Sequence, residues 1–194
     1  MMPANQLSRY ILLMLDSVFD EESQTQRWHL VAINEGDDNY VLEGPFFKTI
    51  FDSGGADTLD WSAQSWNTIL DLNTEYRGTV NYFGSDELTF LHSETLELLA
   101  QTGWILGLGK GTIIENIIAG SGDDVIQLDT QSLIDGQLIP NVIRAGAGHD
   151  TVSGIAYGDQ IFGESGNDEF TLFDTTFSII DGGDGLDSID LLHF

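Results

Sequence analysis

Four copies of a nine-residue glycine–aspartate pattern constrain this chain more than any other feature. Each copy has a small residue at position one, glycine at positions two and four, aspartate at position six and an apolar residue at position eight, and the other positions vary. The copies begin at Ala119, Ala145, Gly163 and Gly182. In the third copy Glu164 takes the second position. Ordinary Gly-Asp turns are the alternative interpretation, but such turns do not repeat in register with an apolar residue such as Val152 or Phe170. The pattern therefore predicts a repeated structural unit.

The spacing of the copies predicts how they stack. Their starting positions differ by 26, 18 and 19 residues. The pattern resembles the calcium-binding nonapeptide of RTX haemolysin-type proteins, in which two nonapeptides, or 18 residues, make one coil of a parallel β-roll. The four loops then lie on one side of the roll, one in each coil. The step of 26 predicts an eight-residue insertion within Leu128–Arg144, and the step of 19 predicts one extra residue near 172–181. On the opposite side, Gly154–Phe162 keeps only Asp159 and Leu172–Asp181 lacks the sixth-position aspartate, so we expect that side to be weakly metallated or empty.

The nonapeptide resembles the calcium-binding repeat of RTX haemolysin-type proteins. Calcium takes six to eight oxygen ligands from carboxylates and carbonyls, and glycines let a turn bring carbonyls close to an ion. Because a roll of short strands holds little apolar core, bound metal has to supply folding energy. The candidate ligand positions are Gly120, Gly122, Asp124, Gly146, Gly148, Asp150, Gly163, Gly166, Asp168, Gly183, Gly185 and Asp187.

The charge balance narrows the classes of function. The chain has 32 acidic and 6 basic side chains, a formal net charge of −26. This excludes nucleic-acid binding through phosphate neutralisation and argues against binding to anionic membranes.

The absence of cysteine excludes disulfides and thiolate metal sites. The longest early apolar run, Tyr10–Leu15, is far shorter than the roughly 20 residues that a membrane span needs, and it makes a poor secretory signal.

Three zones follow from the pattern along the chain. Residues 1–33 form an N-terminal lead-in, in which the apolar spacing of Leu7 to Phe19 predicts a short amphipathic helix. Residues 34–118 mix aromatic and β-branched residues and predict a small β region, and residues 119–194 carry the repeats. The expected fold is all-β, a parallel β-roll with a short N-terminal helix and a β cap. Glu87–Leu99 fits either a helix or a strand and turn.

The order of the motifs resembles the C-terminal domain of serralysin-type metalloproteases over roughly residues 34–190. Three segments carry the resemblance, namely Asn34–Tyr40, Asp52–Ser62 and Thr112–Asp124. The resemblance implies two further calcium ions. One takes the carbonyls of Asn34, Gly36 and Asp38 with the side chains of Asp52 and Asp57; the other takes the turn of Gly54 and Gly55, Asp57, the carbonyl of Ile113 and the carboxylate of Glu115.

This chain also departs from the serralysin pattern. The connection 83–104 is longer, an extra stretch lies near 128–144, and the protease domain is missing. None of His29, His92, His149 and His193 belongs to a His-Glu-x-x-His zinc motif. Asp52-Ser53-Gly54-Gly55 resembles a serine nucleophile stretch, but too few residues precede Ser53 for the rest of a triad. We therefore expect no enzyme in this chain.

The expected function is that of a secreted, extracellular module that folds on binding roughly three to five calcium ions. The resemblance implies export by a type I secretion apparatus. Two alternatives stay open. The chain is an interaction module of an RTX adhesin, with a glycan or protein ligand at the 83–104 insertion, or it is the accessory half of a metalloprotease. The aromatic residues Trp61, Trp66, Tyr76, Tyr82, Phe83 and Trp104 fit either a binding platform or a packed core.

Overall fold

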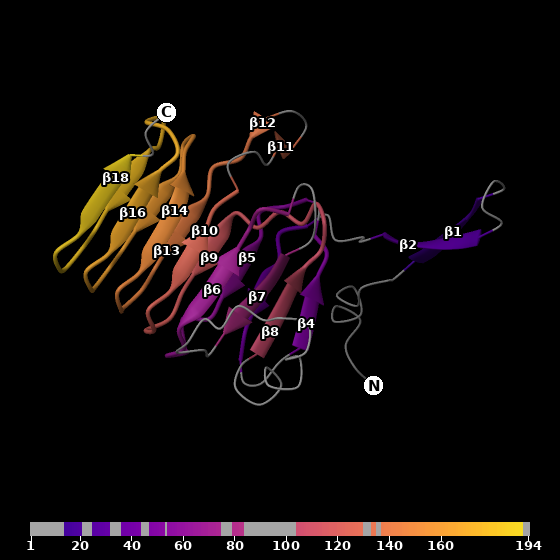
Figure 1. The fold of residues 1–194 in the computed structure, drawn as a ribbon, viewed down its shortest axis with the longest axis horizontal. Helices are drawn as coiled ribbons and strands as arrows, with labels where there is room; N and C mark the ends of the chain where they lie inside the picture. Colours follow the sequence, from indigo (N-terminus) through magenta and orange to yellow (C-terminus); the bar gives the residue numbers. More distant parts are fainter. Residues whose placement is uncertain are drawn as a thin grey trace.

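The computed structural model describes residues 14–20, 25–31, 36–43, 47–52, 54–74, 79–83, 104–129, 133–134 and 137–191, and these residues form β-strands and connections without a helix. Most of the strands belong to two sheets (Figure 1). The eight-stranded sheet has the order β18-β16-β14-β10-β6-β7-β8-β4, and the six-stranded sheet has the order β17-β15-β13-β9-β5-β3. The expectation of an all-β chain with parallel strands is confirmed.

The strands of the six-stranded sheet pair only in parallel. They are β3 (Asn39–Val41), β5 (Thr58–Asp60), β9 (Asn116–Ile118), β13 (Val142–Arg144), β15 (Gln160–Phe162) and β17 (Ile179–Asp181). Each has only three residues, so alternation turns the middle side chain inward. Leu59, Ile117, Ile143 and Ile161 occupy this middle position and are fully buried.

The eight-stranded sheet contains one reversed strand. Its members are β4 (Phe47–Ile50), β6 (Thr68–Asp71), β7 (Thr79–Phe83), β8 (Trp104–Leu108), β10 (Val125–Gln127), β14 (Thr151–Ile155), β16 (Glu169–Leu172) and β18 (Ser188–Leu191). Only β7 pairs antiparallel to its neighbours. In the pairing of β7 with β8, Phe83 lies opposite Trp104, so the long connection predicted over 83–104 leaves and re-enters the sheet at neighbouring positions.

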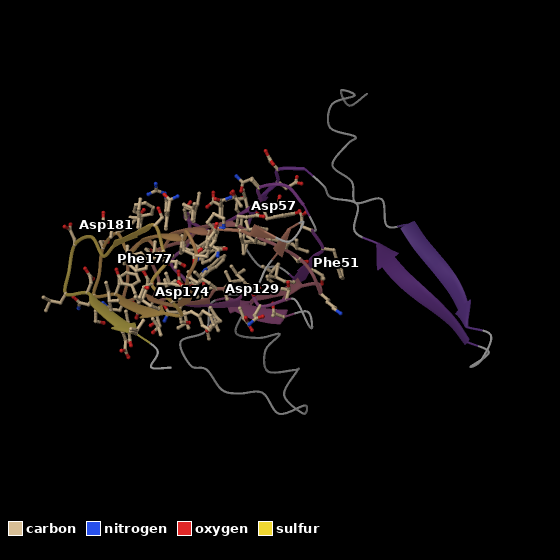
Figure 2. All side chains as sticks on the ribbon, turned by 90° about the horizontal axis from the view of Figure 1, so that it is seen from above. Phe51, Asp57, Asp129, Asp174, Phe177 and Asp181 are labelled. Atoms are coloured by element: carbon tan, nitrogen blue, oxygen red, sulfur yellow. The ribbon has the colours of Figure 1, made fainter. Side chains whose placement is uncertain are left out.

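Apart from residues 128–141, the chain alternates between the two sheets from β9 onward. We call each pair of consecutive strands a rung: β9–β10, β13–β14, β15–β16 and, as the last rung, β17–β18 (residues 179–191). The repeat loops, residues 119–124, 145–150, 163–168 and 182–187, join the two strands within each rung. The apolar side chains of both sheets fill the space between them and form one buried cluster (Figure 2).

The predicted insertion within Leu128–Arg144 is confirmed. It carries a separate two-stranded sheet of β11 (Leu133–Ile134) and β12 (Gln137–Leu138), while β10 and β13 on either side keep their register with the following rung. The irregular step near 172–181 is also visible. Its connection, residues 173–178, is longer than its counterpart 156–159, and the register between β14 and β16 shifts beside Gly154.

The helix predicted from Leu7 to Phe19 is wrong where the structure describes it. Met14–Asp20 form strand β1, which pairs antiparallel with β2 (Thr25–Val31) over seven residue pairs. The apolar residues Met14, Leu15, Val18 and Phe19 suit one face of a helix, but a pattern this short also suits a strand. The partner strand settles the conformation, because pairing satisfies its backbone groups. Residues 7–13 lie outside the described part.

Candidate metal centre

The four repeat aspartates form a column across the rungs. Each stands immediately before a strand of the eight-stranded sheet, and these strands pair in parallel and in register. The backbone N–H of Asp124 donates to Asp150 Oδ1 at 2.8 Å, that of Asp150 to Asp168 Oδ1 at 2.9 Å, and that of Asp168 to Asp187 Oδ1 at 3.0 Å. One carboxylate oxygen of each later aspartate therefore joins neighbouring rungs.

A carboxylate oxygen on each of three of these aspartates has no hydrogen-bond partner. Asp124 is 0 % exposed, and Asp150 and Asp168 are 1 % exposed. Even so, Asp124 Oδ1, Asp150 Oδ2 and Asp168 Oδ2 are buried without a donor. A buried carboxylate oxygen without a partner is costly, because the charge has lost its water. The residues present therefore fit a cation, which would supply the missing partner.

The glycines of the repeat loops allow neighbouring loops to approach closely. A Cβ at Gly166 would lie 1.5 Å from the carbonyl oxygen of Gly148, and a Cβ at Gly148 would lie 2.4 Å from that of Gly122. A Cβ at Gly163 would lie 2.3 Å from Asp168 Oδ2. Gly120, Gly146, Gly183 and Gly185 show the same close approach. The structure thus brings every predicted repeat glycine into the loops that contain the aspartate column.

Burial raises the pKa of these carboxyl groups. The pKa of Asp150 rises to about 8, because burial is reinforced by the charges of Asp124 and Asp168, against a hydrogen bond from the Asp124 N–H. Burial raises the pKa of Asp124 to about 6, although the Trp61 indole N–H, which donates to Asp124 Oδ2, lowers it. The pKa of Asp168 is raised by burial and by Asp187. Held together without a counter-ion, these groups favour their protonated forms.

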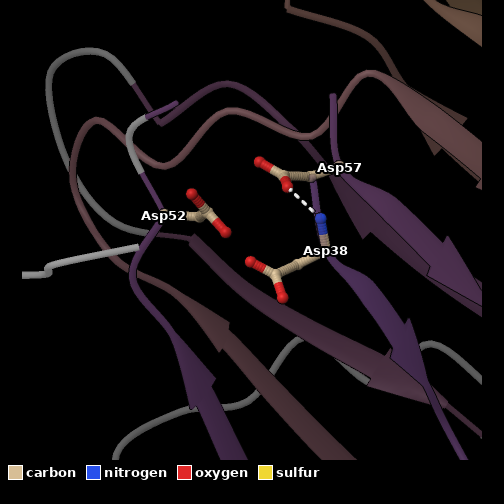
Figure 3. A group of neighbouring side chains, drawn as sticks. All are labelled: Asp38, Asp52 and Asp57. Carbon is tan, nitrogen blue, oxygen red and sulfur yellow. Dashed lines mark hydrogen bonds between the residues drawn. The ribbon is translucent and has the colours of Figure 1, made fainter. Parts of the chain in front are cut away.

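A second acidic group lies where residues 36–38, 52–57 and 115 meet. Carboxylate oxygens of Asp38, Asp52 and Asp57 lie within 4.8 Å of one another, and this group could hold a metal ion (Figure 3). The N–H of Asp38 donates to Asp57 Oδ1 at 2.9 Å, and the N–H of Asp57 donates to Glu115 Oε2 at 2.7 Å. The other oxygens, Asp57 Oδ2 and Glu115 Oε1, are buried without a partner.

Burial and crowding raise two pKa values in this second group. Burial and the neighbouring charges of Asp52 and Glu115 raise the pKa of Asp57 to about 7, although the Asp38 N–H lowers it. Burial also raises the pKa of Glu115. Asp52 is better satisfied, because the Tyr40 hydroxyl donates to its Oδ2 and the Gly54 N–H donates to its Oδ1 at 3.3 Å.

The other residues implied by the serralysin resemblance lie around this group. A Cβ at Gly55 would lie 2.4 Å from the carbonyl oxygen of Gly36, so these two turns stack closely. The N–H of Ile113 donates to the carbonyl of Asp52 at 3.1 Å. Asn34 lies outside the described residues.

Asp159 is buried like Asp124, Asp150 and Asp168, but both of its carboxylate oxygens accept hydrogen bonds. Its Oδ1 accepts from the N–H of Asn141 at 2.7 Å and from Asn141 Nδ2 at 3.1 Å, and its Oδ2 accepts from the N–H of Ala156 at 2.8 Å. The bonds from Asn141 join this rung to its neighbour.

Sequence reasoning missed a second, outer ladder at the fifth position of the repeat. The N–H of Asp123 donates to Asn67 Oδ1, that of His149 to Asp123 Oδ1, that of Asn167 to His149 Nδ1, and that of Leu186 to Asn167 Oδ1. The sequence held a signal for it, because Asp123, His149 and Asn167 are all short side chains that can accept a hydrogen bond.

Among the candidate catalytic and aromatic residues, the structure describes the contacts of His149 and Trp61. Nδ1 of His149 accepts a backbone N–H, and Trp61 is buried in the core with its Nε1 donating to Asp124 Oδ2 at 3.2 Å. Ser53, His92 and His193 lie outside the described part, as does the stretch Glu87–Leu99.

Comparisons with known proteins add no family assignment. No protein-family model matches the sequence, and no curated protein matches it. Among the described residues, no helix has the length and apolar character needed to cross a membrane.

Proposed function

We propose that this chain is a calcium-binding module in which ions held between rungs complete a parallel β-roll. The observation that carries the proposal is the set of buried carboxylate oxygens without partners, three in the repeat column and two beside Asp38 and Asp52. Each lies next to a second acidic residue or a glycine turn, so carboxylate and carbonyl oxygens are both at hand. We infer roughly three to five ions, in line with six to eight oxygens per calcium.

The donor set favours calcium over other cations. The described groups are carboxylate and backbone oxygens, which are hard ligands, and the chain has no cysteine. Magnesium demands near-ideal octahedral geometry and keeps several waters, whereas calcium accepts irregular sites built from backbone turns. Loops fixed by glycine stacking offer irregular geometry of this kind.

Calcium binding and folding are coupled in this proposal. Without an ion, several buried carboxylates must stay protonated or leave the interior, and the chain has a net charge of −26. An ion that binds only the folded state stabilises it by mass action. Millimolar calcium outside the cell would load such sites, so we place the folded module in the extracellular space, after export by a type I secretion apparatus.

A comparison of two buried aspartates tests the proposal. Asp150→Asn keeps an acceptor for the Asp124 N–H and removes the charge, whereas Asp159→Asn removes an equally buried charge that is already satisfied by hydrogen bonds. Isothermal titration should show wild-type protein binding several calcium ions, the Asp150 variant losing one or two of them, and the Asp159 variant losing none.

Circular dichroism provides the second measurement. We expect the calcium-free chain to lose strand signal, calcium to restore it, and an equal concentration of magnesium to restore much less. Identical spectra in chelator and in calcium, together with unchanged ion binding by the Asp150 variant, would refute the proposed function.

A further inference from the structure

The last rung exposes a surface that every earlier rung buries. Ile126, Val152 and Phe170 occupy equivalent positions in the paired strands and are 0 % exposed, whereas Ile189 at the same position of β18 is 58 % exposed. In the other sheet Ile180 continues the column of Ile143 and Ile161, and it is only partly buried. The apolar interior is therefore open at this end of the described structure.

Both strands of the last rung are also edge strands. β17 ends the six-stranded sheet. β18 ends the eight-stranded sheet (Figure 1). Native edge strands are kept from pairing by proline, by charged side chains, above all lysine, by bulges or by being very short. The two strands of the last rung are short, but residues 179–191 contain neither proline nor lysine, and all their charged side chains are aspartates. An open edge of this kind is a template for adding a strand from another polypeptide.

The stacking of the loops specifies what fits above this edge. A Cβ at Gly185 would lie 1.4 Å from the carbonyl oxygen of Gly166, and a Cβ at Gly183 would lie 2.1 Å from that of Glu164. A rung placed on Gly183 and Gly185 in the same way needs glycine at both positions. The Asp168 N–H donates to Asp187 Oδ1 of the following rung. A further rung in the same arrangement needs an aspartate whose carboxylate accepts from the Asp187 N–H.

We propose that the open face of the last rung, residues 179–191, binds a segment of another polypeptide that carries the pattern Gly-x-Gly-x-Asp-x-apolar. The segment adds one strand to each sheet, covers Ile189 and Ile180 with its own apolar residues, and continues the aspartate column. The outer ladder stops at Leu186, whose side chain cannot accept a hydrogen bond and is 85 % exposed. An apolar residue at the facing position of the segment therefore fits best.

A second copy of this chain fits the face less well. The opposite ends of the two sheets are β3 and β4. Residues 42–46, which join these strands, lack the glycine–aspartate pattern. Head-to-tail stacking of two copies would therefore not offer the last rung the spaced glycines and the aspartate that a further rung needs. The observations favour a repeat-type segment.

A labelled peptide tests the proposal directly. A fluorescein-labelled peptide of residues 173–191 reproduces one rung, and its anisotropy is followed as full-length protein is added in saturating calcium. We expect saturable binding. A matched peptide with Gly185→Ala should bind at least tenfold more weakly, because its added methyl would meet a carbonyl of the rung below.

Two protein variants locate the contact. Ile189→Lys places a charge under the added strand and should weaken peptide binding at least tenfold, whereas Asp190→Asn, on the outward side of the same strand, should leave it unchanged. Equal binding of the two peptides would overturn the proposal. So would self-association of the protein that the peptide does not inhibit.

The inference rests on the proposed function only in that calcium orders the last rung. The circular dichroism of each sample separates the two ideas. A calcium-responsive protein that binds no peptide overturns the docking proposal alone. A protein without any calcium response overturns the proposed function, and the same peptide titration without calcium then decides the docking.

Discussion

At the scale of single residues, the two oxygens of each repeat aspartate have different roles. In Asp150 and Asp168 one oxygen accepts the N–H of the preceding rung, and the other is buried without a partner. Asp159 has both oxygens occupied by N–H groups. The same side chain at the same depth therefore serves as a candidate ligand in one loop and as a structural clamp in another. The local supply of N–H donors makes the difference.

Substitution of Gly166 should lower the free energy of unfolding more than substitution of a glycine that needs only a positive φ. Gly166→Ala places a methyl 1.5 Å from the Gly148 carbonyl oxygen at a φ of 145°, so neighbouring loops must separate. We expect the calcium-loaded variant to lose at least ~3 kcal/mol of unfolding free energy, as large structural clashes do. Urea denaturation in excess calcium measures this loss.

Gly111→Ala is the matched control for that substitution. Gly111 has a φ of 78° but no atom within 4 Å of an added methyl. Its variant should lose only about 1–2 kcal/mol, the cost of a left-handed conformation for an L-residue. Equal losses at both positions would show that loop stacking contributes nothing.

At the scale of elements, the insertion within 128–141 is separable from the sheets. Between β10 and β13 the chain has residues 128–141, whereas residues 156–159 connect β14 and β15, and the insertion's strands β11 and β12 pair only with each other. Deleting residues 131–138 restores the 18-residue spacing. We expect the deletion variant to keep its calcium-induced dichroism change and a melting temperature within a few degrees of wild type. Loss of that calcium response would mean that the insertion is part of the fold.

The sequence predicted the elements that repeat and mispredicted one that does not. Register between rungs could be deduced because Asp124, Asp150, Asp168 and Asp187 recur with an apolar residue two places later. The stretch from Met14 to Phe19 has no such repetition, and its conformation depends on pairing with Thr25–Val31. A short apolar pattern carries no information about a distant partner, so local periodicity favoured a helix there.

The sequence predicted which aspartates line up in the candidate site, but not how their oxygens are hydrogen-bonded. The spacing of the repeats placed the aspartates in one column. It could not show that Asp159 is saturated by Asn141 and Ala156, or that Trp61 donates to Asp124. These contacts depend on which residues of neighbouring rungs face each other, and the repeat pattern does not specify the residues outside it.

At the scale of the whole molecule, the large negative charge and the small apolar core both oppose folding. The interior contributed by each short strand is one side chain, and the chain carries a net charge of −26. Cations or protons can relieve the resulting repulsion. Protons and calcium ions should therefore compete for the same carboxylates. Raising the pH should then lower the stability of the calcium-free protein and raise its affinity for calcium.

The pH dependence follows from the raised pKa values. Folding raises the pKa of Asp150 from 3.8 to about 8, of Asp57 to about 7 and of Asp124 to about 6. The folded state therefore binds protons more tightly than the unfolded chain, and its stability without calcium falls as pH rises from about 4 to about 8. Calcium-free protein should show more strand signal by circular dichroism at pH 5.5 than at pH 8.

Calcium binding should release protons over the same range, because the ligands must ionise to hold the metal. Calorimetric titration at pH 7 in two buffers of different ionisation enthalpy measures the release directly. Asp150→Asn should reduce it, since that position can no longer give up a proton, whereas Asp181→Asn, a substitution on an exposed strand end, should leave it unchanged. Proton uptake on calcium binding, or a calcium-free protein that is more ordered at pH 8 than at pH 5.5, would contradict the assignment of these buried carboxyls as calcium ligands.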